Sequence, residues 1–224
     1  MDENQKPLIL VFGGTGKVGR HVIPYALSQG FRVRAFVRSP DKLKNIIDSN
    51  SPDLDIFQGD LTNEESVIQG CEGNVKYVIF VAGMPNFKWN RQKKWVMTNG
   101  IKSLQKDMTK HGIKRMLYLA GTPNPAPNQK LSFGIKFLKL FLIICLGDKW
   151  NIKDNDSVIS FLTHQDQIDY IVIRPLFFLS HLTINKLKAS PKVGGIVTFS
   201  ETGRFAVDAV QDNNLIGSFP YVSR

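Results

Sequence analysis

Three glycines, Gly13, Gly16 and Gly19, recur at every third position near the start of the sequence. Glycine has no Cβ atom, so its backbone can turn sharply and approach a ligand closely. The apolar run 8–12 precedes these glycines, and a helical pattern follows from about Val18. A turn between a buried strand and a helix offers free amide groups and the positive end of the helix dipole, which together bind anions. The spacing therefore predicts a phosphate-binding turn; the alternative is a plain glycine-rich turn.

The pattern G-x-x-G-x-x-G is a spacing variant of the fingerprint that binds a dinucleotide. In that motif the first glycine makes the tight turn, the second admits the pyrophosphate, and the third lets the helix pack close to the strand. We expect the three glycines to have these roles in the same order. The expected binding turn comprises Gly13, Thr15, Gly16, Lys17, Val18 and Gly19.

Arg38 stands at the end of the second predicted strand, about 20 residues after the last glycine. Proteins that bind NAD place an Asp or Glu there, which bonds the ribose 2′-hydroxyl. A carboxylate would repel a 2′-phosphate, whereas a guanidinium binds it through two parallel hydrogen bonds. The sequence therefore favours NADP(H) over NAD(H), with Ser39 and Lys42 completing the pocket. The alternative is that Arg38 only meets solvent at a strand end.

Two further strand ends supply candidate cofactor contacts. Asp60 and Leu61 follow the third predicted strand, where they could contact the adenine ring. Asp60 could instead be only a turn or helix-cap residue. The small residues Val81, Ala82 and Gly83 end the fourth strand and would leave room for the nicotinamide ribose, or they simply end that strand.

The elements that must position these residues alternate along the chain. Strands are predicted over 8–12, 32–37, 54–58, 77–82, 115–119 and 170–173. Helices are predicted over 18–28, 96–112 and 154–164. Two further helices are predicted to begin at 40 and at 64, the second with Thr62 as its capping residue. This order predicts an α/β fold, a Rossmann-type doubly wound parallel sheet with helices on both faces. We expect one domain over 1–224, with a core over 7–175 and a small substrate-side extension over 176–224 that contains strand-like pieces near 196–199 and 219–222.

Composition limits the remaining functional classes. The 224 residues are 42% hydrophobic and carry a formal net charge of +10. The basic residues are spread along the chain, so a solvated surface and a polyphosphate cofactor explain the charge without nucleic acid. Cys71 and Cys145 have no partner at metal-ligand spacing, which predicts reduced cysteines and no metal site. The first residues lack the pattern of a signal peptide, so we expect a cytoplasmic monomer or homodimer.

Residues 131–146 form an apolar stretch that is interrupted by Ser132, Gly134, Lys136 and Lys139. The stretch is shorter than the ~20 residues that span a bilayer. The interpretation that we favour is a helix or lid packed over the substrate end of the sheet. The second interpretation is an exposed surface that binds a partner or a second copy of the chain. The third interpretation is an in-plane membrane helix with its lysines toward anionic lipid.

With these motifs, the chain resembles the atypical short-chain dehydrogenase/reductase superfamily, and within it the NAD(P)H-binding group of NmrA-like proteins and biliverdin reductase B, the flavin reductase. The matching stretches are Gly13–Gly19, Val37-Arg38-Ser39-Pro40, Gly59-Asp60-Leu61, Val81-Ala82-Gly83, His111–Arg115 and Asp169–Pro175. The resemblance implies a Rossmann fold with a small-molecule substrate over the nicotinamide. It implies an NADPH-dependent reductase of a conjugated acceptor such as a flavin, quinone or tetrapyrrole; the alternative is a non-catalytic redox sensor of the NmrA type.

The sequence departs from the family at the catalytic positions. Short-chain enzymes use a Tyr-x-x-x-Lys pair, in which the lysine lowers the pKa of the tyrosine. No tyrosine here has a lysine four residues later. Flavin and biliverdin reductases have a serine after the fifth strand, where this chain has Thr122, and a histidine in the next helix, where it has Ser160. Thr122 and Ser160 are therefore weak catalytic candidates, and Thr122 could equally be a loop residue.

Overall fold

A six-stranded parallel sheet forms the centre of the molecule. The computed structural model describes residues 6–83, 95–121, 123–145, 149–179 and 185–224. The strand order is β3-β2-β1-β4-β5-β6. The strands are β1 (Leu8–Phe12), β2 (Arg32–Val37), β3 (Leu54–Gln58), β4 (Val75–Phe80), β5 (Arg115–Leu119) and β6 (Asp169–Ile173). The predicted strands are confirmed, except that β4 begins and ends two residues earlier than 77–82, because Val81 donates the last bond to Phe12 and Ala82 leaves the ladder.

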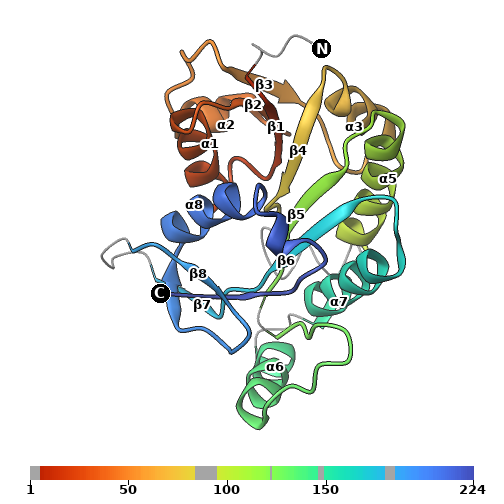
Figure 1. Cartoon of the computed structure of the whole chain (residues 1–224), viewed down its shortest axis with the longest axis vertical. Helices are drawn as coiled ribbons and strands as arrows, with labels where there is room; N and C mark the ends of the chain where they lie inside the picture. The colour runs from red at the N-terminus through yellow and green to blue at the C-terminus, as the bar shows by residue number, and fades with distance from the viewer. Residues whose placement is uncertain (1–5, 84–94, 122, 146–148, 180–184) are drawn as a thin grey trace.

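Helices cover both faces of the sheet (Figure 1). Along β1, Ile9 and Val11 point into one hydrophobic core, and Leu10 and Phe12 point into the other. The first core is closed by α1 (Gly19–Ser28), α2 (Pro40–Lys44) and α8 (Phe199–Ala209), and the second by α3 (Glu64–Cys71), α5 (Val96–Lys110) and α7 (Lys149–His164). The predicted Rossmann-type, doubly wound fold is therefore confirmed.

The order of the strands reverses beside β1. The chain runs outward from β1 through β2 to β3, then returns to place β4 on the other side of β1. In open parallel sheets, a crevice forms at such a reversal, outside the carboxyl ends of the strands. The glycine-rich turn follows β1 directly, so the fold places this turn in the crevice.

Two helix starts differ from the prediction. Asn63, not Thr62, caps α3, because its side chain accepts a hydrogen bond from Ser66 N at 3.0 Å. The Thr62 hydroxyl donates instead to the Asp60 carboxylate. Helix α7 begins at Lys149 rather than at 154, so Asp154 lies inside that helix, where its carboxylate is free to bond another element.

The C-terminal region adds two small sheets and a helix that packs on the core. β7 (Phe177–Leu179) pairs with β9 (Ile196–Thr198), and β8 (Lys188–Ser190) pairs with β10 (Tyr221–Ser223). A short 3-10 helix, η1 (Asn213–Leu215), precedes β10. Helix α8 lies so close to α1 that a Cβ atom on Gly203 would lie 2.9 Å from that of His21. The region from 176 onward therefore contributes to the first core as well as flanking the site.

The apolar stretch forms helix α6 (Phe133–Cys145), at the end of the molecule farthest from β2 and β3 (Figure 1). The helix is confirmed, but its packing as a lid is not. Most of its large apolar side chains are exposed, with Phe133 at 85% and Ile144 at 68%. A helix this rich in apolar residues buries only the side that meets a neighbour, and among the described elements its main neighbour is α7. No helix within the described residues is long and apolar enough to cross a membrane.

Candidate functional site

The turn after β1 is built so closely that two of its glycines cannot be replaced without strain. Gly13 has a φ of +89°, and a Cβ atom there would lie 2.5 Å from the Ala82 nitrogen. A Cβ atom on Gly19 would lie 2.1 Å from the Gly13 carbonyl oxygen. Gly16 N donates to that same oxygen at 2.9 Å, which closes the turn. The expected roles of Gly13 in turning and of Gly19 in close packing therefore have a geometric basis.

The start of α1 is open toward ligands. Val18 occupies the N-cap position with helical backbone angles, and no side chain there accepts a hydrogen bond from the first turn. Arg20 N and His21 N already donate to the Gly16 and Val18 oxygens, so the helix dipole is the feature of this helix start that favours an anion. Gly16 has only the Gly13 oxygen near its missing Cβ, so a pyrophosphate could approach the backbone at this point. These features fit the turn of a dinucleotide-binding site.

A cavity of about 850 Å³ extends from this turn along the carboxyl ends of the first strands. The volume lies within the roughly 300–1,000 Å³ of small-molecule sites. All of the predicted cofactor-binding residues except Gly19 and Ser39 line it. The residues around it are Phe12, Gly13, Thr15, Gly16, Lys17, Val18, Phe36, Val37, Arg38, Lys42, Asn45, Ile46, Gly59, Asp60, Leu61, Thr62, Val81, Ala82, Gly83, Val96 and Met97.

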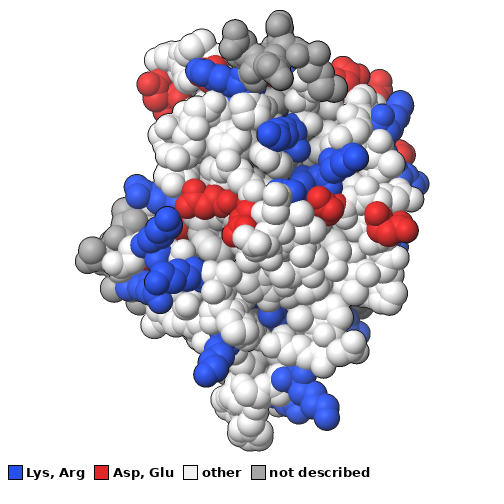
Figure 2. All heavy atoms as spheres, in the orientation of Figure 1, with Lys and Arg blue, Asp and Glu red and all other residues white. Residues whose placement is uncertain are grey.

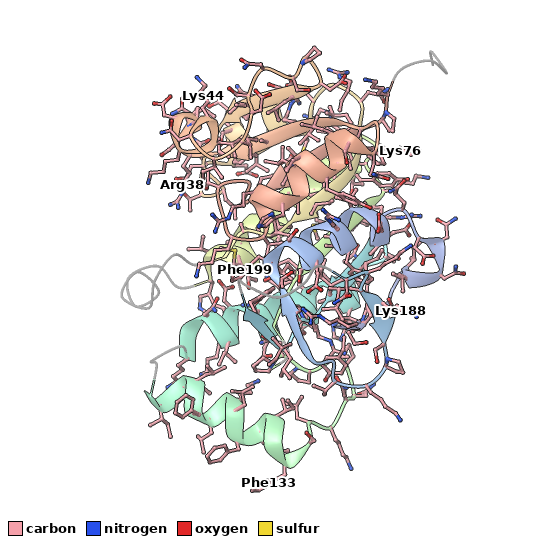
Figure 3. The ribbon with its side chains drawn as sticks, turned by 90° about the vertical axis from the view of Figure 1, so that its left-hand side faces the viewer. Arg38, Lys44, Lys76, Phe133, Lys188 and Phe199 are labelled. Atoms are coloured by element: carbon pink, nitrogen blue, oxygen red, sulfur yellow. The ribbon has the colours of Figure 1, made fainter. Side chains whose placement is uncertain are left out.

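Three cations in the wall of the cavity come from two segments. Lys17 belongs to the turn itself, while Arg38, labelled in Figure 3, and Lys42 come from the continuous segment of β2 and α2. All three are exposed enough to reach a ligand. Ser39 is the N-cap of α2 but does not line the cavity. The ends of a dinucleotide phosphate chain would thus meet positive charge on both sides.

Stacked aromatic rings support the part of the cavity beside Gly59. The rings of Phe12 and Phe36 lie 4.6 Å apart, and Phe36 stacks on Phe57 at 5.6 Å. A Cβ atom on Gly59 would lie 2.4 Å from the Phe36 ring, so the glycine lets the chain pass directly over it. Sequence reasoning missed Phe36 as a site residue. Its place near the end of the predicted strand 32–37 was the available signal, but Arg38 was the residue selected at that strand end.

Asp60 acts as a turn residue, which is one of the two roles that the sequence allowed for it. Its carboxylate accepts hydrogen bonds from the Thr62 nitrogen and hydroxyl, each at 2.8 Å. Asp60 also lines the cavity. Leu61 packs on α5, where a Cβ atom on Gly100 would lie 2.4 Å from it. The segment between β3 and α3 is therefore fixed before any ligand binds.

The wall of the cavity that Val96 and Met97 form depends on a contact between α5 and α7 that the sequence did not reveal. The buried carboxylate of Asp154, on α7, accepts hydrogen bonds from the Met97 and Thr98 nitrogens at 2.9 Å. These amides are the orphan donors of α5, so Asp154 caps that helix from outside. Val96 and Met97 reach the cavity in consequence. A pattern that identifies Asp154 only as part of a helix cannot show this.

The structure places one of the two weak catalytic candidates, Ser160, and it does not line the cavity. Thr122 lies outside the described residues. Ser160 is exposed on α7, because its neighbours Val158 and Ile159 face the core, and it does not line the cavity. The geometry of α7 therefore gives no support to a catalytic role of Ser160 in this cavity.

The other reactive groups near the sheet are held in inert states. The Tyr118 hydroxyl is buried and donates to Asn155 at 2.6 Å, and burial raises the pKa of Tyr118. Burial likewise raises the pKa of the Cys71 thiol to about 12. Among the described residues, no cluster of His, Cys, Asp and Glu could hold a metal ion. The described part of the site thus offers binding groups rather than an acid or a nucleophile.

Comparison with known proteins agrees with this geometry. The sequence model of a family described as NAD(P)H-binding matches residues 13–213. Dihydroflavonol 4-reductase of Callistephus chinensis is 29% identical over 143 residues, which cover 58% of this chain and 38% of that protein. The chain therefore matches well under half of the length of this curated relative.

Solved structures show the same fold. ChuY, an anaerobilin reductase from Escherichia coli O157:H7, is 18% identical with a TM-score of 0.73, and the match covers 96% of each chain. A short-chain dehydrogenase/reductase from Veillonella parvula DSM 2008, solved in complex with NADP, is 12% identical with a TM-score of 0.75. That match covers 98% of this chain and 95% of the other.

Proposed function

We propose, from the premise that this chain belongs to the NAD(P)H-binding family, that it is a reductase that uses NADPH to reduce a small conjugated acceptor. The family assignment supports a nicotinamide cofactor and an oxidoreductase-type fold. The choice of NADPH, the acceptor and catalysis itself are the parts that we propose.

Arg38 is the observation that carries the choice of cofactor. It lines the cavity beyond the end of β2, where a protein selective for NAD has a carboxylate. Asp60 is the only acidic residue among the described lining residues, and its carboxylate accepts from Thr62. A guanidinium beside Lys42 favours a dianionic 2′-phosphate over a hydroxyl, since charge-assisted pairs are about twice as strong as neutral ones.

An aromatic pair supports a planar acceptor. Phe178 and Phe199 stack with ring centroids 4.5 Å apart, and both are half-buried. The pair lies beside the turn, since Lys17 Nζ is 5.3 Å from the Phe199 ring. Offset stacking on such rings suits a flat, conjugated molecule. Bound NADPH would supply the hydride, and the protein would supply alignment and exclusion of water. A strong protein acid is not required for such a transfer, which agrees with the missing Tyr-x-x-x-Lys pair.

Binding constants for NADPH and NADH test the cofactor. The wild-type protein should bind NADPH at least about tenfold more tightly, and Arg38→Ala should remove most of that preference by weakening NADPH alone. Lys44→Ala is the matched control, because Lys44 is a cation on the same helix α2 that does not line the cavity. Equal affinities of the wild-type protein for the two cofactors would refute the assignment.

Catalysis needs its own assay. Oxidation of NADPH should be followed at its absorbance maximum with a flavin, a quinone and a tetrapyrrole as acceptors. If the protein binds NADPH tightly but oxidises it with none of the three, the alternative function, a redox sensor, becomes the better proposal. The buried Tyr118 and the outward Ser160 favour that alternative. A sensor would bind NADPH and NADP+ without turnover, and its binding to a protein partner would depend on the redox state.

A further inference from the structure

Helix α6 carries an exposed apolar stripe, formed by Phe133, Phe137, Leu140, Phe141 and Ile144. Their exposed fractions range from 46% for Phe141 to 85% for Phe133. The spacing of i, i+4, i+7, i+8 and i+11 places all five within about 100° of arc on one side of the helix. Scattered apolar residues are common on surfaces, but a continuous stripe of this kind marks a binding surface.

Contacts on the opposite side of α6 fix the direction of the stripe. Ile135 is only 8% exposed and lies opposite the stripe on the helical wheel. Lys139 Nζ bonds the Asp156 carboxylate on α7 at 2.9 Å, and Asp156 also accepts from Asn124 Nδ2 at 2.8 Å. The helix is therefore anchored to α7 through one side, and its stripe faces outward.

The charge around the stripe is positive. Helix α6 contains no acidic residue, and the exposed Lys136 flanks the stripe. Lys130 precedes the helix and is also exposed, and the nearest acid on α7, Asp156, is paired with Lys139. On the face that Figure 2 shows, the described charged side chains around the lower end of the molecule, where Figure 1 places α6, are basic. An apolar stripe flanked by lysines complements the surface of an anionic bilayer.

The dimensions of the helix fit a surface location. Thirteen residues form a helix about 20 Å long, which is shorter than the roughly 30 Å of a bilayer core. The stripe offers on the order of 500 Å² of apolar surface, below the roughly 800 Å² that each partner buries in a stable protein interface. A second copy of the chain would also bring the flanking lysines toward one another. Both arguments favour lipid over a second copy.

We propose that α6 is an in-plane membrane helix, which binds the surface of an anionic bilayer through Phe133, Phe137, Leu140, Phe141 and Ile144. The aromatic and aliphatic side chains enter the boundary between headgroups and acyl chains. Lys136 and Lys130 lie at the level of the anionic headgroups, with their apolar stems along the boundary. The remainder of the molecule, including the cofactor cavity, stays in water. This proposal is independent of which acceptor is reduced.

Co-sedimentation of the full chain with vesicles tests the proposal. The wild-type protein should pellet with vesicles that contain phosphatidylserine, and less with vesicles of phosphatidylcholine alone. The double variant Phe133→Ser/Phe137→Ser should bind at least about tenfold more weakly, because two large apolar groups are lost. Lys136→Gln should weaken binding only to the anionic vesicles and should reduce its dependence on salt.

A matched control separates this surface from general hydrophobicity. Val193 and Ile216 are exposed at 41% and 37%, away from α6, so Val193→Ser/Ile216→Ser should leave vesicle binding unchanged. Unchanged thermal unfolding of all the variants shows that they fold. Wild-type protein that stays in the supernatant with both kinds of vesicle would overturn the proposal. A dimer in ultracentrifugation that Phe133→Ser/Phe137→Ser dissociates would overturn it in favour of a second copy.

Discussion

Gly19 decides how closely helix α1 can approach the turn that precedes it. Its missing Cβ would lie 2.1 Å from the Gly13 oxygen, far inside any normal contact, and the neighbours at that point are backbone atoms that cannot move aside. The same turn also supplies Gly13, Gly16 and Val18 to the wall of the cavity. At this scale, stability and ligand binding depend on one missing atom.

Gly19→Ala should therefore lower the free energy of unfolding by roughly 1–3 kcal/mol, as overpacking typically does. It should also weaken NADPH binding strongly, because the start of α1 must shift. Chemical denaturation and cofactor titration measure the two effects. Gly134→Ala is the control, since nothing lies within 4 Å of its missing Cβ, and alanine there should be neutral or slightly stabilising. A Gly19→Ala protein that binds NADPH normally would contradict the assigned turn.

Helix α8 shows how a single element joins the C-terminal region to the site. Its start carries a capping box, in which the Glu201 carboxylate accepts from Thr198 N at 2.6 Å while Thr198 Oγ1 accepts from Glu201 N at 3.0 Å. Glu201 also accepts from Asn185 N at 2.8 Å and pairs with Arg224 at 3.1 Å. The buried carboxylate thus ties two separate segments, those of Asn185 and Arg224, to the end of α8 that carries Phe199.

These bonds make the contribution of Glu201 to stability depend on pH. Burial alone would raise the pKa of Glu201, but hydrogen bonds from Thr198, Asn185 and Arg224 outweigh it and hold the pKa below its ordinary 4.5. A lowered pKa in the folded state stabilises the protein above the unfolded pKa, and this stabilisation is lost as the pH falls through the folded value. Glu201→Gln should therefore lower the free energy of unfolding at pH 7 by about 1–3 kcal/mol.

The difference between wild-type and Glu201→Gln protein should shrink as the pH falls below about 4.5, because the carboxylate then binds a proton first in the unfolded state and, at still lower pH, in the folded state. Denaturant titrations over this range measure it. Glu65→Gln, at an exposed position on α3, should show almost no difference at any pH. If the difference in the free energy of unfolding between wild-type and Glu201→Gln protein is the same at every pH, the charge of Glu201 does not contribute to stability.

At the scale of the whole molecule, the cavity connects elements from both cores. Residues from the turn and α2 on one side and from the start of α5 on the other face the same space. A ligand that fills this space contacts segments whose relative positions are set only in the folded state. Binding must then stabilise the fold as a unit, because the unfolded chain has no such site.

NADPH at a hundredfold excess over its Kd should add about 2.7 kcal/mol to the free energy of unfolding. For a chain of this size, that corresponds to a rise in Tm of roughly 5–10 °C. Thermal unfolding followed by circular dichroism measures the rise, which NADH should reproduce only at much higher concentration. An unchanged Tm at saturating NADPH would show that the cavity is not the cofactor site.

The sequence alone determined the features that depend on local pattern. The bounds of β1, β2, β3 and β5 followed from short apolar runs, and the parallel arrangement followed from the alternation of strands with helices. Both could be predicted because periodicity and turn chemistry depend on residues that are neighbours in the sequence. The glycine turn and the place of Arg38 in the wall of the cavity could be predicted for the same reason: each follows a strand, and strand ends meet at one edge of a parallel sheet.

Only the tertiary structure decided which distant segments meet. It placed Met97 in the cavity through the Asp154 carboxylate, put Phe36 beneath Gly59, and turned Ser160 toward solvent. It also left the stripe of α6 exposed, although the same apolar residues were compatible with a buried lid. A hydrophobic pattern predicts that a surface is buried, but the path of the chain determines which neighbouring element can cover that surface.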